Sequence, residues 1–130
     1  MKILLILILL TGCSTVRGNA ELAWQTENFI DMGQTLNTAA RPDCYKETNS
    51  ITALLIGNHP SKGAVVGISV AYSLGHLLIS KAIEHKVHKI DSKGWKYIEG
   101  FWHAIGLFTK TTTVVDNYNN GLRLFSEKCR

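Results

Sequence analysis

The sequence lacks the motifs by which many enzyme families are identified. Its 130 residues contain no HExxH metal-binding helix, no glycine-rich phosphate-binding loop and no nucleophile elbow. The basic residues are scattered rather than gathered into a stripe with interleaved aromatic side chains, which argues against a nucleic-acid interface. There is also no internal repeat and no low-complexity segment. These absences predict a non-enzymatic protein that uses no cofactor.

The clearest functional pattern lies in the first 13 residues. Lys2 is followed by the unbroken apolar run Ile3–Leu10 and then by Thr11, Gly12 and Cys13. A charged start, a short apolar core and small residues before a cleavage point are typical of a secretory signal peptide. The run is too short to span a bilayer, which takes about 20 apolar residues. Its end resembles the bacterial lipobox, in which the cysteine is acylated and becomes the first mature residue; a cleaved peptide with an unmodified cysteine is the alternative.

This reading divides the chain into three parts. Residues 1–12 are the predicted signal peptide, residues 13–19 the acylated cysteine and a tether, and residues 20–130 a single helical domain. Removing the signal peptide leaves 118 residues, which is enough for one modest core. Loss of Lys2 lowers the count of Lys and Arg from 14 to 13 against 10 Asp and Glu, a net charge of +3. This mild excess suits a surface near anionic lipid headgroups.

Two cysteines remain once Cys13 is assigned to the lipid. Cys44 and Cys129 form an even pair in an oxidising compartment, so we expect a disulfide between them. Two free thiols, or pairing between chains, are the alternatives. Neither cysteine has a second metal ligand close in sequence, and no metal site is expected.

Hydrophobic periodicity predicts an all-α fold with three principal helices. They are expected at residues 20–40, 64–89 and 95–118, with a short apolar piece at 51–56. The first helix ends before Pro42, because the residue that precedes a proline avoids the helical region. Residues 91–94 break the pattern between the last two helices, and the β-branched run 111–115 would also suit a strand.

The second predicted helix has two contrasting faces. Its polar residues fall within one arc at about 100° per residue, and they are Ser69, Ser73, His76, Ser80 and Glu84. Small residues lie nearly opposite, and they are Ala64, Gly67, Ala71, Gly75 and Ala82. Small side chains at this spacing predict close packing of another helix, in lipid or in water. The segment is also long enough to cross a membrane.

His76 lies in the middle of this apolar helix and needs a partner. A buried polar group without a hydrogen bond costs about 1–3 kcal/mol, and the first helix offers Asp31, Gln34 and Thr35. We expect these side chains to form a hydrogen-bonded cluster that fixes the first helix against the second. A polar binding cleft or a pH-sensitive contact is the alternative.

Two further groups of side chains have spacings that would allow metal binding or general-base catalysis. Glu84, His85 and His88 are neighbours on one helical face, but no further metal ligand is evident, so a solvated helix end is expected. Glu99 and His103 are four residues apart, which suits a general-base pair or an ordinary helix salt bridge. We expect the ordinary salt bridge.

Several short motifs occur together along the mature chain. They are Asp31, Gln34 and Thr35 in D-x-x-Q-T, Glu47 and Asn49 in E-x-N, and His59, Pro60 and Ser61 in H-P-S. Together they resemble an uncharacterised family of small bacterial and phage-borne lipoproteins or membrane-associated proteins. The resemblance implies a helical fold with a polar core and implies no mechanism. Independently of it, carboxylates and amides in a helical interior must find donors, so these side chains are expected to clamp the loop 42–61 onto the first two helices.

These patterns predict a lipid-anchored, periplasm-facing envelope lipoprotein of contact or binding type. Its partners would be the membrane and an envelope membrane protein, and an origin in a phage or prophage would fit by analogy. A serine directly after the lipid cysteine, here Ser14, resembles the signal that sorts lipoproteins to the outer membrane. The outer membrane is therefore slightly favoured over the inner membrane. One alternative is a small integral protein whose helices at 64–83 and 95–118 span the inner membrane around a polar core. Another is an envelope-directed hydrolase that uses Asp31, Glu47 or His76.

Overall fold

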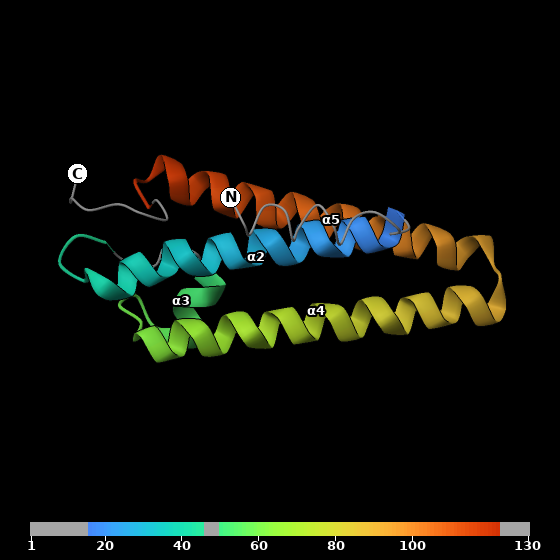
Figure 1. The fold of residues 1–130 in the computed structure, drawn as a ribbon, viewed down its shortest axis with the longest axis horizontal. Coiled ribbons are helices and arrows are strands. Elements are labelled where there is room, and N and C mark those ends of the chain that lie inside the picture. The colour runs from blue at the N-terminus through green and yellow to red at the C-terminus, as the bar shows by residue number, and fades with distance from the viewer. Residues whose placement is uncertain (1–15, 46–49, 123–130) are drawn as a thin grey trace, which may run out of the picture.

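Four helices account for nearly all of the residues that a computed structural model describes, which are 16–45 and 50–122. They are α2 (Val16–Ala40), α3 (Ser50–Ile56), α4 (Lys62–Ile90) and α5 (Lys93–Asn119), and the described residues contain no strand. The three long helices lie side by side in an elongated bundle, in which α4 runs antiparallel to α2 and α5 (Figure 1). The short α3 lies against the beginning of α4. The predicted all-α fold with three principal helices is therefore confirmed.

Side-chain caps explain where α4 and α5 begin. The hydroxyl of Ser61 accepts a hydrogen bond from the backbone N–H of Ala64, and Ser92 caps α5 in the same way. Between the two helices Asp91 adopts the left-handed conformation, with φ of 42°, and ends α4. Its carboxylate lies 2.7 Å from Lys96 Nζ, and this hydrogen bond lowers the pKa of Asp91. The predicted break between the two helices is confirmed at 91–92, while residues 93 and 94 already belong to α5.

One local prediction is wrong, and one alternative is excluded. Residues 16–19 were expected in a tether, but α2 already begins at Val16. Its first turn is held by an ion pair between Arg17 Nε and Glu99 Oε2 of α5, at 2.7 Å. The β-branched run 111–115 is helical rather than extended. There the hydroxyls of Thr112 and Thr113 donate to carbonyl oxygens one turn earlier, which satisfies them within the helix.

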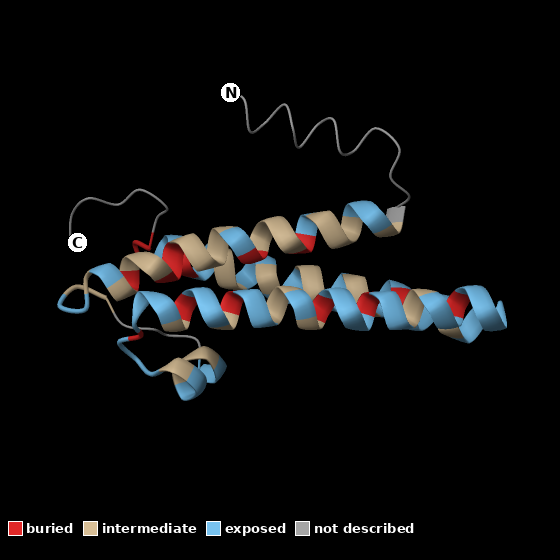
Figure 2. Cartoon of the chain, turned by 60° about the horizontal axis from the view of Figure 1, so that its bottom comes forward, coloured by how far each residue is buried: buried red, intermediate tan, exposed pale blue. Residues whose placement is uncertain are grey.

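The interior of the bundle is polar and much of its exterior is apolar. Nine polar or charged side chains are buried, against only four hydrophobic ones, among the described residues. The exposed large hydrophobic side chains include Val66, Val70, Leu74, Leu77, Leu78 and Ile79 on α4, and Tyr97, Ile98, Phe101, Ile105, Phe108 and Val115 on α5. In Figure 2 the buried positions form short red patches between broad exposed surfaces. A bundle that folds in water shows the opposite distribution.

The structure shows which face of α4 points into the bundle and which points outward. Ser69, His76 and Ser80 point inward and are buried. The small-residue face points outward, and a methyl group added at Gly67 or Gly75 would meet no atom within 4 Å. The prediction that another helix packs on that face is wrong for the described chain. The facing side chains of α2 and α5 carry hydrogen-bonding groups, which need the polar face of α4 as their partner.

Candidate functional site

The three long helices meet at the carboxylate of Glu21. His76 Nδ1 of α4 lies 3.0 Å from Glu21 Oε2. The hydroxyl of Ser80 donates to the same oxygen at 2.7 Å and accepts the indole N–H of Trp102, on α5, at 2.9 Å. Gln25 donates to the other oxygen of Glu21 at 2.7 Å. One carboxylate therefore receives hydrogen bonds from three side chains on two helices and is connected through Ser80 to the third.

The imidazole of His76 is held between two indole rings. Trp24 stacks on it with ring centroids 3.8 Å apart, and Trp102 lies 4.9 Å away on the other side. Because an ionised carboxylate only accepts hydrogen bonds, Nδ1 carries the proton that faces Glu21. The other nitrogen, Nε2, is buried and has no hydrogen-bond partner among the described residues. It faces Gly106, where an added methyl group would lie 3.1 Å from it.

A second polar cluster lies farther along α2 and joins it to α5. Lys110 Nζ lies 2.7 Å from Asp31 Oδ2, and Asn117 donates to the other carboxylate oxygen at 3.0 Å. The same ammonium group lies over the rings of Trp24 and Tyr72, at 5.6 and 5.5 Å from their centroids. Both charges of the Asp31–Lys110 pair are largely shielded from the surface. This cluster fixes the register of α2 against α5.

The predicted partners of His76 are therefore wrong, although the predicted polar contact between α2 and α4 exists. Asp31 faces α5, Gln34 donates to the carbonyl oxygen of Val114, and Thr35 is buried one residue further along. Asp31 lies ten residues beyond Glu21, which is about 15 Å along a helix, too far to reach His76.

The sequence does contain a signal for Glu21. Polar residues of α2 recur at spacings of three, four or seven, and they include Glu21, Gln25, Asn28, Thr35 and Thr38. Asn28 donates to the carbonyl oxygen of Ser69 at 3.0 Å and to the hydroxyl of Ser73 at 2.9 Å. Glu21 was missed because the predicted helix began at residue 20, which placed this carboxylate at a frayed end rather than inside a continuous polar face.

The other predicted side-chain pairs have mixed outcomes. The predicted salt bridge between Glu99 and His103 is wrong. The carboxylate of Glu99 pairs instead with the guanidinium group of Arg17, which comes from α2. Glu84 pairs with Lys81 at 2.7 Å and lies 3.9 Å from His88, at the exposed end that was expected. No group of three or more His, Cys, Asp or Glu side chains within residues 16–45 and 50–122 is arranged to hold a metal ion.

Several predicted residues lie outside the part of the chain that the structure describes. Glu47 and Asn49 belong to the segment 46–49, so their role in clamping the loop stays a prediction. Cys44 is disulfide-bonded. Cys13 and Cys129 lie outside the described residues, so acylation of the first and the pairing of the second with Cys44 also stay predictions.

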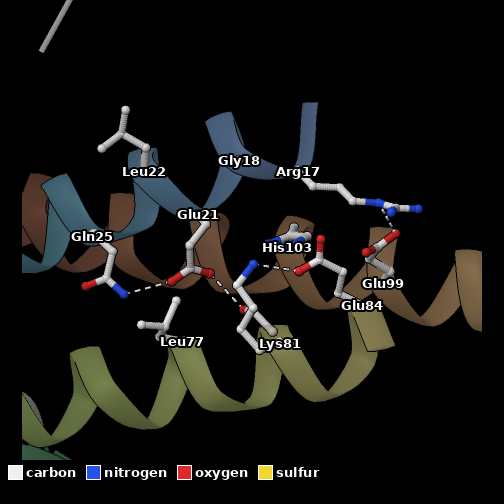
Figure 3. A pocket seen from close by; sticks show the side chains of 11 residues that line it. Arg17, Gly18, Glu21, Leu22, Gln25, Leu77, Lys81, Glu84, Glu99 and His103 are labelled. Atoms are coloured by element: carbon white, nitrogen blue, oxygen red, sulfur yellow. Dashed lines mark hydrogen bonds and ion pairs between the residues drawn. The ribbon is translucent and has the colours of Figure 1, made fainter. Parts of the chain in front are cut away.

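A cavity of about 320 Å³ opens beside Glu21, between α2, α4 and α5. Figure 3 shows Glu21 and Gln25 on one wall, Lys81 and Glu84 on another, and Arg17 with Glu99 at the end nearest the α4–α5 turn. The lining carboxylates have donors or opposite charges: Gln25 and Ser80 for Glu21, Lys81 for Glu84 and Arg17 for Glu99. This arrangement suits a structural polar network that water can reach from one side.

Comparison of the sequence and the structure with protein families, curated proteins and solved structures gives no match. The resemblance drawn from short motifs therefore stays a prediction. The function has to be argued from the distribution of polar and apolar side chains.

Proposed function

We propose that this chain is a non-enzymatic, lipid-anchored protein of the bacterial cell envelope whose helical body is seated in lipid through α4 and α5. The observation that supports the proposal is the inverted distribution of side chains, with hydrogen-bonded polar groups inside and large apolar groups outside. In a bilayer the polar groups of a protein must satisfy one another internally, because lipid offers no hydrogen bonds. The networks around Glu21 and Asp31 meet that requirement for both carboxylates and for Ser80 and Lys110, whereas His76 Nε2 is left without a partner among the described residues.

The length and the hydropathy of α4 support its insertion into the bilayer. The helix is long and apolar enough to cross a membrane, with a mean hydropathy of 1.6 over its most apolar window. The core helix of a water-soluble protein can pass the same test, but such a helix is mostly buried, whereas only 17% of this window is buried. No charged residue lies between Lys62 and Lys81. That interval is about 28 Å long, close to the hydrocarbon thickness of about 30 Å.

The charges of α5 support the same arrangement. Between Lys96 and Asp116 the helix contains only Glu99 and Lys110 as charged residues, apart from the titratable His103. Glu99 is buried against Arg17, and Lys110 is paired with Asp31 inside the bundle. The outward side chains over this interval are apolar, aromatic or hydroxyl-bearing. Ionisable residues in a membrane helix are tolerated when they face the bundle interior and pair there.

The proposed anchor and the proposed seat in lipid are compatible. Cys13 lies three residues before Val16 in the sequence, and α2 begins toward the end of the bundle that carries the α4–α5 turn (Figure 1). Helices that span lipid suit the inner membrane, because outer membranes rarely contain them. The apolar exterior therefore leads us to propose the inner membrane, in place of the outer membrane that Ser14 slightly favours.

Membrane fractionation of a body without the anchor tests this proposal. The mature chain is exported behind a cleavable signal peptide that does not direct acylation, and membranes are washed with alkaline carbonate. We expect the body to stay in the membrane pellet. In a matched variant with Val70→Gln, Leu74→Gln and Leu78→Gln, which changes only exposed positions of α4, we expect release from the membrane. Recovery of the unaltered body as a soluble periplasmic protein would contradict the seat in lipid and favour a body held by its lipid alone.

The proposed contact role needs a separate test. Cross-linking in intact cells, followed by purification of the full chain from detergent extracts, should recover an envelope membrane protein. Recovery of lipid and no protein partner, at several cross-linker lengths, would argue against a contact function while leaving the seat in lipid intact.

A further inference from the structure

Exposed lysines gather at one end of the bundle. Within residues 81–96 five lysines are exposed, and Asp91 is the only exposed acidic residue among them. We call Lys81, Lys86, Lys89, Lys93 and Lys96 the lysine cluster. Lys81 and Lys96 form surface ion pairs with Glu84 and Asp91. The other three have no ion pair among the described residues.

The lysine cluster lies where the proposed seat in lipid ends. It occupies the last turns of α4 and the first turn of α5, at the end of the bundle where α2 begins (Figure 1). Ile90 and Tyr97 lie among the lysines and are 51% and 77% exposed. Tyrosine is enriched at the boundary between lipid and water, where its ring contacts acyl chains and its hydroxyl contacts water. A mixture of exposed lysine, isoleucine and tyrosine is the composition expected at the headgroup level of a membrane.

The opposite end of the bundle has no such excess of positive charge. Its exposed charged residues, among those described, are Lys62, Asp43 and Asp116. Among the described residues, the end that carries the lysine cluster therefore has the larger exposed positive charge and complements an anionic surface better. Electrostatic attraction to anionic lipid falls off within about 10 Å at moderate salt, so it acts on the end that lies at the headgroups.

We infer that the lysine cluster binds the headgroups of anionic phospholipids and thereby fixes the depth and direction of the bundle in the bilayer. This inference rests on the proposed seat in lipid and adds the lipid class to it. Each lysine near an anionic surface contributes roughly a fivefold change in binding, so the three without ion pairs together correspond to about a hundredfold.

Lipid selectivity of the reconstituted full mature chain tests the inference. Energy transfer is measured from the protein's tryptophans to dansyl-labelled phosphatidylglycerol and, separately, to dansyl-labelled phosphatidylcholine. Trp95 lies in the first turn of α5, beside the lysine cluster, and serves as the nearest donor. We expect preferential transfer to the anionic lipid, weakened by salt. Lys86→Gln, Lys89→Gln and Lys93→Gln together should abolish the preference, whereas the three Lys→Arg changes and the single change Lys62→Gln should retain it.

The possible failures are distinguishable. Equal transfer to both lipids in the unaltered protein, or a preference that survives the triple Gln change, would overturn the inference and leave the seat in lipid standing. No transfer to either lipid would overturn both the seat and the inference. Circular dichroism of each variant checks that the helices are retained, which exposed Lys→Gln changes should not alter.

Discussion

Glu21 and His76 lie 55 residues apart in sequence and meet across the α2–α4 interface, with Oε2 3.0 Å from Nδ1. This contact fixes the register of the two helices, because it is supported from a third helix by Trp102 through Ser80. A polar contact of this kind is specific in direction and distance, whereas apolar packing tolerates small slips. The register of the bundle therefore depends on a small number of buried polar side chains.

Glu21→Ala should destabilise the bundle by about 2–4 kcal/mol, because it leaves the donors on His76, Ser80 and Gln25 without their acceptor. Thermal unfolding in detergent micelles, followed by circular dichroism, measures the change. Glu84→Ala is the matched control, since it removes only surface contacts, with Lys81 and His88. An unchanged melting temperature for Glu21→Ala would contradict the role of this carboxylate.

Gly106→Ala should destabilise the protein by about 1–3 kcal/mol, although alanine is normally the better helix former. The added methyl group would lie 3.1 Å from His76 Nε2 and 3.2 Å from the Trp24 ring. Gly100→Ala meets no atom within 4 Å and should stabilise α5 by about 1 kcal/mol. The two variants should shift the melting temperature in opposite directions. Equal shifts would show that the stacked rings of Trp24 and His76 do not restrict α5.

Asp31→Asn should cost about 3 kcal/mol, because it leaves the ammonium group of Lys110 inside the bundle without its counter-charge. Adding Lys110→Met should restore part of the loss, since the buried charge is then removed. Asp91→Asn, at a fully exposed position, should leave the melting temperature unchanged. Failure of the double change to recover any stability would show that the cluster acts through packing instead.

Single cysteines should map the lipid-facing surface. With the protein in native membranes, Leu74→Cys and Phe101→Cys should resist a water-soluble maleimide, whereas Lys89→Cys should react. All three positions are exposed on the protein itself, so a denaturing detergent that also removes the lipid should make them equally reactive. Labelling is measured by mass shift against the parent chain. Equal reaction rates in native membranes would place α4 and α5 in water.

Non-reducing peptide mapping should identify Cys129 as the disulfide partner of Cys44. Cys44 is bonded in the structure, and its partner lies outside the described residues. If the pair closes this long loop, Cys44→Ser should cost about 2–4 kcal/mol. A Cys44 peptide linked to Cys13 would contradict both this pairing and acylation at Cys13.

The sequence predicted helix positions better than helix contacts. The ends of α4 and α5 follow from local chemistry, since Ser61, Asp91 and Ser92 act on backbone groups within a few residues. The partner of His76 depends on how far α2 slides along α4, and that distance is set by contacts formed far apart in sequence. Periodicity places residues on a face, but several polar residues of α2 share the face and offer several registers.

The direction of the α4 faces could not be predicted for a related reason. A face of small residues and a face of hydrogen-bonding residues both suit a helix interface, so the pattern alone does not say which one is inside. The choice is made by Asn28 and Trp102, whose polar atoms bond to α4 and turn its serines and His76 inward. Once that is fixed, Gly67 and its neighbours point outward.

The outward side chains of α4 and α5 also bear on biosynthesis. A body that presents Leu78, Phe101 and Phe108 to its surroundings would aggregate in an aqueous compartment unless something covered these residues. A chain that lies in lipid, as we propose, is best released sideways from an export channel into the adjacent bilayer while it is being made. Its yield in a cell should therefore depend on the supply of insertion machinery, and overproduction should give inclusion bodies before it gives free protein.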